Sequence, residues 1–175
     1  MRKVVYGGAM SLDGFIAGPN GEYDWIVMDP DVDFMALMGR FDTFLIGRKT
    51  FEVMRRMGNA APPAPGIQNI VFSRTLRPGD CPAGTILSDD AERVVADLRT
   101  KSGKDIALFG GGELFRGLLA AGLVDELHFN VIPVLLGCGI PMLPPPARRE
   151  RLELKTHRVY EKTGTVGLEY AVLHT

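Results

Sequence analysis

Apolar and polar positions follow two periods along the chain, one typical of strands and one typical of helices. Short apolar runs, which predict buried strands, cover residues 4–10, 43–46, 69–73 and 106–109. Apolar residues at helical spacing predict helices after Pro30, over residues 50–57, between 88–90 and 101–103, and from Glu113 to Gly122. Strands that alternate with helices are typical of an α/β protein with a mainly parallel sheet.

The C-terminal part of the chain changes to strands alone. Residues 127–132 alternate between apolar and other side chains, and two more strands are predicted over 152–160 and 166–173. The turn residues Lys162-Thr163-Gly164 between the last two strands indicate an antiparallel hairpin. We therefore expect an α/β fold whose mostly parallel central sheet has an antiparallel C-terminal edge.

Composition narrows the class of protein. The 175 residues, of which 46% are hydrophobic, suit one globular domain over 1–175. A formal charge of −1 offers no general attraction for nucleic acid or an anionic membrane, and no apolar run is long enough to span one. No signal peptide is evident, and Cys81 and Cys138 form neither a disulfide framework nor a C-x-x-C site. We expect a cytoplasmic protein with no nucleic-acid or membrane partner.

A glycine-rich turn is the first candidate for chemistry. Gly110-Gly111-Gly112 separates the strand 106–109 from the helix that begins near Glu113. Glycines allow a ligand to approach the backbone, and the free N–H groups of a helix N-terminus attract an anion such as a phosphate. The alternative is that the glycines only form a tight turn. The turn lacks the third glycine and the later acidic residue of the Rossmann fingerprint, so a dinucleotide here would need another architecture.

Two further strand ends carry hydroxyl groups and cations. Gly47-Arg48-Lys49-Thr50 opens a helix with two positive charges, which the helix dipole disfavours unless an anion binds there. Ser73-Arg74 repeats a hydroxyl and a guanidinium after the next strand. The alternative is that these side chains extend into water. Ligands of open α/β sheets gather at the carboxyl ends of strands, which favours a shared anion site.

These motifs, in their order and spacing, resemble the dihydrofolate reductase-like superfamily, and in particular the reductase domain of the riboflavin-biosynthesis deaminase-reductase and its stand-alone relatives. Further carriers are Ser11-Leu12-Asp13-Gly14-Phe15-Ile16-Ala17 and Gly122-Leu123-Val124-Asp125-Glu126-Leu127. The resemblance implies a three-layer fold, NADPH as cofactor and a homodimer. It assigns the cofactor site to Gly47, Arg48, Lys49, Thr50, Ser73, Arg74, Gly110, Gly111, Gly112, Glu113 and Leu114.

On the substrate side the resemblance implies two catalytic carboxylates. Asp13 would lie at the substrate end of the cleft, with the alternative that it organises a turn through backbone N–H groups. Asp31 stands about where dihydrofolate reductases place a pterin-binding carboxylate, with the alternative of an ordinary first-turn acid. Asp24 and Trp25 are candidate substrate-binding residues because an aromatic face suits a flat heterocycle, although core packing of Trp25 is equally compatible with the sequence.

One departure from the family pattern bears on the substrate. Phe15 stands where the riboflavin-pathway reductases usually carry a cation, which removes a partner for a phosphorylated substrate. The three histidines have no metal-ligand spacing, and no zinc-deaminase signature occurs. We predict an NADPH-dependent reductase of a nitrogen heterocycle, resembling 5-amino-6-(5-phosphoribosylamino)uracil reductase. The alternatives are a dihydrofolate or pterin reductase and a non-catalytic dinucleotide-binding module.

Overall fold

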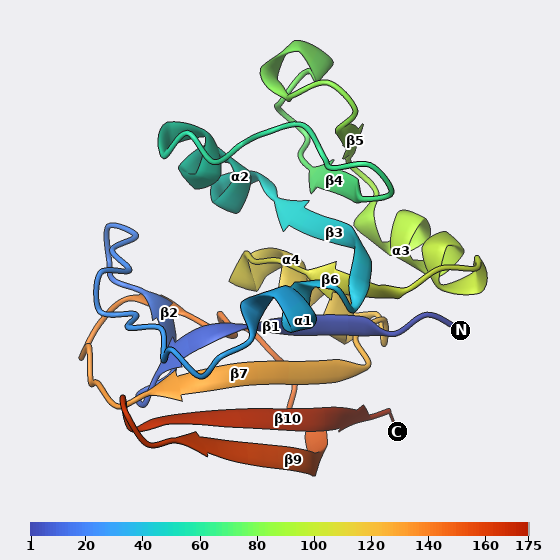
Figure 1. Cartoon of the computed structure of the whole chain (residues 1–175). Coiled ribbons are helices and arrows are strands. Elements are labelled where there is room, and N and C mark those ends of the chain that lie inside the picture. Colours follow the sequence, from blue (N-terminus) through green and yellow to red (C-terminus); the bar gives the residue numbers. More distant parts are fainter. Residues whose placement is uncertain (175) are drawn as a thin grey trace.

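The central element of the computed structural model, which describes residues 1–174, is an eight-stranded sheet with the order β5-β4-β3-β6-β1-β7-β10-β9 (Figure 1). Its strands are β1 (Val4–Ser11), β3 (Phe41–Gly47), β4 (Gln68–Phe72), β5 (Ile86–Ser88), β6 (Asp105–Leu108), β7 (Glu126–Ile132), β9 (Arg151–Tyr160) and β10 (Thr165–Leu173). Strands β2 (Phe15–Ala17) and β8 (Ile140–Pro141) pair separately. The helices are α1 (Phe34–Met38), α2 (Arg48–Arg56), α3 (Ala91–Thr100), α4 (Gly112–Ala120) and the 3-10 turn η1 (Pro78–Asp80).

Strand directions confirm the predicted fold class. Each neighbouring pair from β5 to β7 is parallel, whereas β10 pairs antiparallel with both β7 and β9. Gly164, with φ of 72°, lies in the turn between β9 and β10, where a residue without a Cβ adopts a positive φ at little cost. The predicted hairpin therefore forms the antiparallel edge of the sheet.

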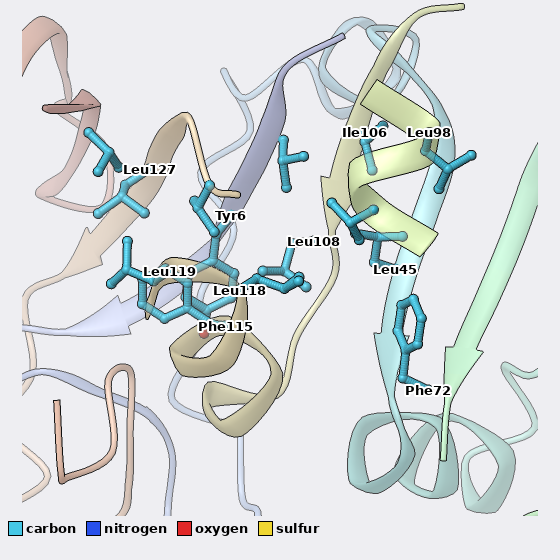
Figure 2. Close-up of a cluster of buried hydrophobic side chains, with 14 of the residues drawn as sticks. Tyr6, Leu45, Phe72, Leu98, Ile106, Leu108, Phe115, Leu118, Leu119 and Leu127 are labelled. Atoms are coloured by element: carbon cyan, nitrogen blue, oxygen red, sulfur yellow. The ribbon is translucent and has the colours of Figure 1, made fainter. Parts of the chain in front are cut away.

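Helices cover both faces of the sheet, which gives three layers. On one face α3 and α4 bury Leu98, Phe115 and Leu118 against β1, β3 and β6. Figure 2 shows Phe115 and Leu118 directed from α4 toward Tyr6, and the rings of Tyr6 and Phe115 stack with centroids 4.0 Å apart. On the other face Phe51 of α2 packs on β3 and β4, and α1 lies in front of β1 and β6 (Figure 1). Burial of these apolar side chains on both faces stabilises the sheet.

Local signals account for the helix boundaries. Asp90 accepts a hydrogen bond from Arg93 N at 3.0 Å and caps α3, and Asp33 caps α1 in the same way through Ala36 N at 2.9 Å. The short strands β2, β5 and β8 and the turn η1 were not predicted. They contain only two or three residues each, too few to show a period.

Candidate active site

The carboxyl ends of β4, β3 and β6 lie next to one another. Gly47 at the end of β3 is in register with Phe72 at the end of β4, and Leu45 is in register with Leu108 of β6. The three motifs at the ends of these strands, residues 47–50, 73–74 and 110–112, therefore lie together where the carboxyl ends of the parallel strands meet. We call this set the glycine edge. Carboxyl ends of parallel strands are where ligands of open α/β sheets bind.

Glycines allow the turns after β3 and β6 to approach each other closely. Gly47 N donates to Gly110 O at 3.4 Å, and Gly110 and Gly111 have φ of 111° and 93°. A Cβ added to Gly110 would lie 3.1 Å from Thr50 Cγ2, which is a tight contact, whereas one added to Gly47 would make only ordinary contacts of 3.4 Å or more. The turn therefore requires glycine for its backbone angles and for space, which is compatible with both a tight turn and a ligand cradle.

Cations and hydroxyl groups at the glycine edge differ in what they contact. Arg48 forms an ion pair with Glu52 at 2.8 Å, whereas Lys49 and Arg74 are exposed and form no ion pair within residues 1–174. The Ser73 hydroxyl accepts from Thr75 N at 3.1 Å and from Leu76 N at 3.0 Å, so it organises the turn that carries Arg74. Two cations thus extend from an edge that has no acidic residue in the first turn of α2.

The remaining residues predicted for the cofactor site lie at the start of α4, and they differ in what they contact. Gly112 is buried, and a Cβ there would lie 2.8 Å from Pro144 Cδ, so Gly112 serves close packing. Glu113 is exposed and forms an ion pair with Arg116 at 2.6 Å. Gly111 is the N-cap of α4 and provides no side-chain hydrogen bond to the helix N-terminus. The free N–H groups of this terminus favour an anion.

A cleft lies beside the glycine edge, on the sheet face that carries α1. Its floor contains small residues, among them Gly7, Ala9 and Ala107, and its walls are apolar, including Ile26, Leu37 and Phe41. Phe109 also lines it and directly precedes Gly110. We call this space the apolar cleft. It reaches the glycine edge through Phe109, so two ligands bound in the two places would be neighbours.

Asp29 is the carboxylate of the apolar cleft, and the sequence reasoning missed it. It is only 2% exposed and accepts hydrogen bonds from Asp31 N at 2.9 Å, Thr163 N at 3.1 Å and Thr163 Oγ1 at 2.9 Å. Burial raises the pKa of this carboxyl, but these hydrogen bonds together with the charge of Lys162 outweigh it and hold the pKa below its ordinary value. Asp29 thus joins the segment before α1 to the turn between β9 and β10.

His128 lines the cleft from β7 and belongs to a buried charge network. Its Nε2 lies 2.9 Å from Glu126 Oε2, and Glu126 Oε1 accepts from Lys3 Nζ at 2.5 Å. Burial raises the pKa of Glu126, but Lys3 and His128 outweigh it, so the pKa lies below its ordinary value. His128 Nδ1 is buried and has no hydrogen-bond partner among residues 1–174. Because Nε2 faces a carboxylate, it carries a proton, and Nδ1 is the nitrogen left for other chemistry.

Asp13 lies outside the residues that line the cleft. Its carboxylate accepts from Ser11 Oγ at 2.6 Å, from Leu136 N at 3.1 Å and from Gly137 N at 2.7 Å. The hydrogen bond from Ser11, followed by those from Gly137 and Leu136, lowers the pKa of Asp13. These are the contacts of the turn-organising alternative, extended to a second loop. A catalytic role for Asp13 stays a prediction without support from this geometry.

The other residues predicted for the substrate side lie around the mouth of the cleft. Asp31 is exposed and forms an ion pair with Lys162 at 2.8 Å. Trp25 Nε1 donates to Glu22 O at 3.1 Å, and Asp24 is exposed. None of these three is among the residues that line the cleft. Their neighbours Ile26 and Asp29 line it instead, so substrate roles for Asp24, Trp25 and Asp31 stay predictions without support from this geometry.

Phe15 also lies away from the apolar cleft. It belongs to β2, and a Cβ added to Gly139 would lie 3.2 Å from Phe15 Cγ. The aromatic side chain therefore packs over the loop before β8. A cation at this position would stand beside that loop, so the charge of the cleft is decided by other residues.

Within residues 1–174, no group of three or more His, Cys, Asp or Glu side chains is arranged to hold a metal ion. No helix in the described part of the chain has the length and apolar character that crossing a membrane requires.

The fold and the two adjoining ligand spaces define a class, the dihydrofolate reductase-like α/β proteins, and comparison with known sequences gives the family. Residues 2–166 match the family described as RibD C-terminal domain, and the chain belongs to that family. A relative is the protein YyaP of Bacillus subtilis (strain 168), which is 35% identical over 179 residues that cover 97% of this chain and 94% of YyaP.

Solved structures agree with this assignment. A putative riboflavin biosynthesis protein from Shewanella sp. PV-4 superposes with a TM-score of 0.79 at 26% identity, covering 99% of this chain and 100% of that one. Dihydrofolate reductase from Enterococcus faecalis, complexed with NADP(H), superposes with a TM-score of 0.71 at 19% identity, covering 98% and 97%. The second likeness shows the fold alone. The superfamily expected from the sequence motifs is confirmed.

Proposed function

We propose that the protein is an NADPH-dependent oxidoreductase that reduces a nitrogen heterocycle. The observation that carries the proposal is the juxtaposition of two spaces, an edge of glycine, hydroxyl and unpaired cations and an apolar cleft that meets it at Phe109. Membership of the RibD C-terminal domain family and the likeness to a dihydrofolate reductase with NADP(H) support it. A reduction by hydride requires a dinucleotide and an acceptor to lie side by side.

The residues present at the glycine edge fit a dinucleotide phosphate. Gly111 leaves the N-terminus of α4 without a side-chain cap, and Lys49 and Arg74 are available for charge-assisted hydrogen bonds. We assign Gly110, Gly111 and Thr50 to the pyrophosphate and Lys49 and Arg74 to the 2′-phosphate. When bound, the nicotinamide supplies the hydride, and the chain supplies position and charge.

The apolar cleft would orient the acceptor and keep water from it. Its small floor residues leave room for a flat ring, and its apolar walls exclude solvent. The proton that accompanies the hydride needs a titratable group in the cleft. Asp29 already accepts three hydrogen bonds, whereas His128 Nδ1 has no partner within residues 1–174. We therefore assign the proton to the imidazolium form of His128, which would donate it from Nδ1 and keep its second proton on Nε2 toward Glu126, the positioning residue.

The direct test is reduction of a substrate panel by purified protein. NADPH oxidation is followed spectroscopically with pterins, dihydrofolate and aminopyrimidines, each against a blank without the heterocycle. We expect oxidation with at least one ring compound. Activity confined to dihydrofolate and pterins would favour the alternative of a dihydrofolate or pterin reductase. Tight NADPH binding without reduction of any compound in the panel would favour a non-catalytic dinucleotide-binding module.

We also propose, from the family resemblance, a homodimer. Support comes from β9, an edge strand whose Leu152, Leu154 and Val159 are 41%, 50% and 58% exposed on the face shared with α4. An edge strand with exposed apolar side chains is a common place for a second chain to bind. Light scattering of the wild type and Leu154→Lys tests this, with a dimer expected only for the wild type. A monomeric wild type would contradict it.

A further inference from the structure

The apolar cleft carries a charge pattern that bears on its substrate. No Lys or Arg is among the residues that line it, within the described chain. Its titratable lining residues are Asp29 and His128, and the second of these contacts Glu126. Both carboxylates are nearly buried, at 2% and 8% exposure, and their lowered pKa values mean that they are ionised at neutral pH.

Cations do occur around the mouth of the cleft, but each is engaged. Lys162 pairs with Asp31 at 2.8 Å, and Arg40 lies 3.8 Å from Glu169. Arg158 donates to Asp31 O at 3.4 Å and stacks on the ring of Tyr160 at 4.7 Å. Glu169 also lies 3.7 Å from His128. A ligand phosphate here would meet carboxylates first and would have to displace an existing partner to reach a cation.

The glycine edge shows the opposite arrangement. Its Lys49 and Arg74 form no ion pair within residues 1–174, and no acidic residue stands in the first turn of α2. Phosphate chemistry is therefore concentrated on one side of the site. A phosphate on the substrate in the apolar cleft would lie in an apolar, water-poor space, where repulsion between like charges is stronger than in bulk water.

We propose that the ring substrate of the apolar cleft carries no phosphate: the cleft takes a flat nitrogen heterocycle that is neutral or positively charged, with its hydrogen-bond donors toward Asp29. This inference rests on the proposed reductase function and narrows its substrate class. It separates this chain from a reductase of a phosphoribosylated pyrimidine, and the ground for the separation is the charge of the cleft.

Two matched pairs of ligands test the proposal. One is a ribosylaminopyrimidine with and without its 5′-phosphate, and the other is hydroxymethylpterin with and without a phosphate ester. Binding to the whole protein is measured by calorimetry with and without bound NADPH, and turnover is measured by NADPH oxidation. We expect the unphosphorylated member of at least one pair to bind at least roughly tenfold more tightly, as one repelled charge at short range would produce.

Val27 offers a way to reverse the preference. It lines the cleft and is 60% exposed, so a longer side chain there should not disturb the fold. Val27→Lys adds a cation at the mouth, and Val27→Gln is the matched control for size and polarity. We expect Val27→Lys to improve binding of the phosphorylated ligands by roughly five- to tenfold, because it adds a partly exposed charge-assisted contact, and we expect no such improvement from Val27→Gln.

The outcomes separate this inference from the proposed function. Equal or tighter binding of the phosphorylated member in the wild type would overturn the inference, and so would failure of every ring compound to bind. Binding of an unphosphorylated ring without any NADPH binding or oxidation would instead remove the reductase function, while the phosphate preference would stand.

Discussion

The glycine edge and the apolar cleft are adjacent, yet they are built from the chain in opposite ways. The edge comes from three contiguous motifs, residues 47–50, 73–74 and 110–112, each directly after a parallel strand. The cleft comes from residues of β1, β3, β6, β7 and β10, of α1 and of the segment before α1, which lie far apart in the sequence. Within residues 1–174 the edge leaves two cations without an ion pair, whereas every cation described around the cleft is engaged. The two regions therefore differ in charge, and we propose that this difference separates the phosphate-bearing cofactor from the ring substrate.

The largest effect is expected from closing the glycine edge. Gly111→Val should abolish NADPH binding, because a branched side chain would enter the ligand's path and resist a φ of 93°. The backbone strain itself costs about 1–3 kcal/mol of folding stability. Gly66→Val is the matched control, since Gly66 has φ of 79° and open space around it. If both variants lose stability equally and both still bind NADPH, the glycine edge is only a turn.

Replacing His128 tests the proton assignment in the cleft. Asn places a polar atom where Nδ1 stands, and Gln places one near Nε2 and Glu126. Neither amide donates a proton as an acid, so turnover should fall by ~10²–10⁴ in both variants, with NADPH affinity unchanged. A Gln variant that turns over like the wild type would show that His128 only supports Glu126.

Replacing Arg74 tests whether the glycine edge binds the 2′-phosphate of NADPH. Arg74→Ala should weaken NADPH binding by roughly 10- to 100-fold and leave NADH binding unchanged, because only the 2′-phosphate distinguishes the two. Arg56→Ala removes the same charge from the far end of α2 and is the control. Equal losses for both cofactors would place Arg74 elsewhere on the dinucleotide, and similar losses in the control would indicate a general charge effect.

The smallest effect is expected from replacing Asp29, which joins the segment before α1 to the turn between β9 and β10. The folded-state pKa of Asp29 is below its ordinary value near 3.8, so its ionised form stabilises the fold above that pH. This contribution is lost as pH falls through the lower folded-state pKa. Asp29→Asn should therefore lower the melting temperature at pH 7 and converge with the wild type in strong acid. Parallel melting curves from pH 7 down to pH 2 would contradict this.

The glycine edge could be predicted from the sequence better than the apolar cleft could. Residues 47–50, 73–74 and 110–112 were predictable because each motif is local, and the sheet only had to bring strand ends together. Asp29 was missed because its burial depends on Thr163, 134 residues later, which no local pattern shows. Asp13 looked catalytic by its motif, but its partners Leu136 and Gly137 lie in a loop whose position only the tertiary structure gives.

The confirmed part of the fold was also predictable from local patterns in the sequence. The buried strands and their helices have periods that the sequence displays, so their alternation and the antiparallel end of the sheet were predictable, whereas the order of the strands in the sheet was not predicted. The network of Lys3, Glu126 and His128 joins the start of β1 to β7 and depends on register. Its signal in the sequence was the placing of Glu126 and His128 two residues apart, on one face of a strand.

The most direct test of the central claim is equilibrium titration of the wild-type protein with NADPH and with NADH under identical salt conditions. The account predicts saturable NADPH binding that is tighter than NADH binding by roughly 10²-fold, as two charge-assisted hydrogen bonds to the 2′-phosphate from Lys49 and Arg74 would give. Equal affinity for the two dinucleotides, or no binding of either, would contradict the assignment of the glycine edge to NADPH.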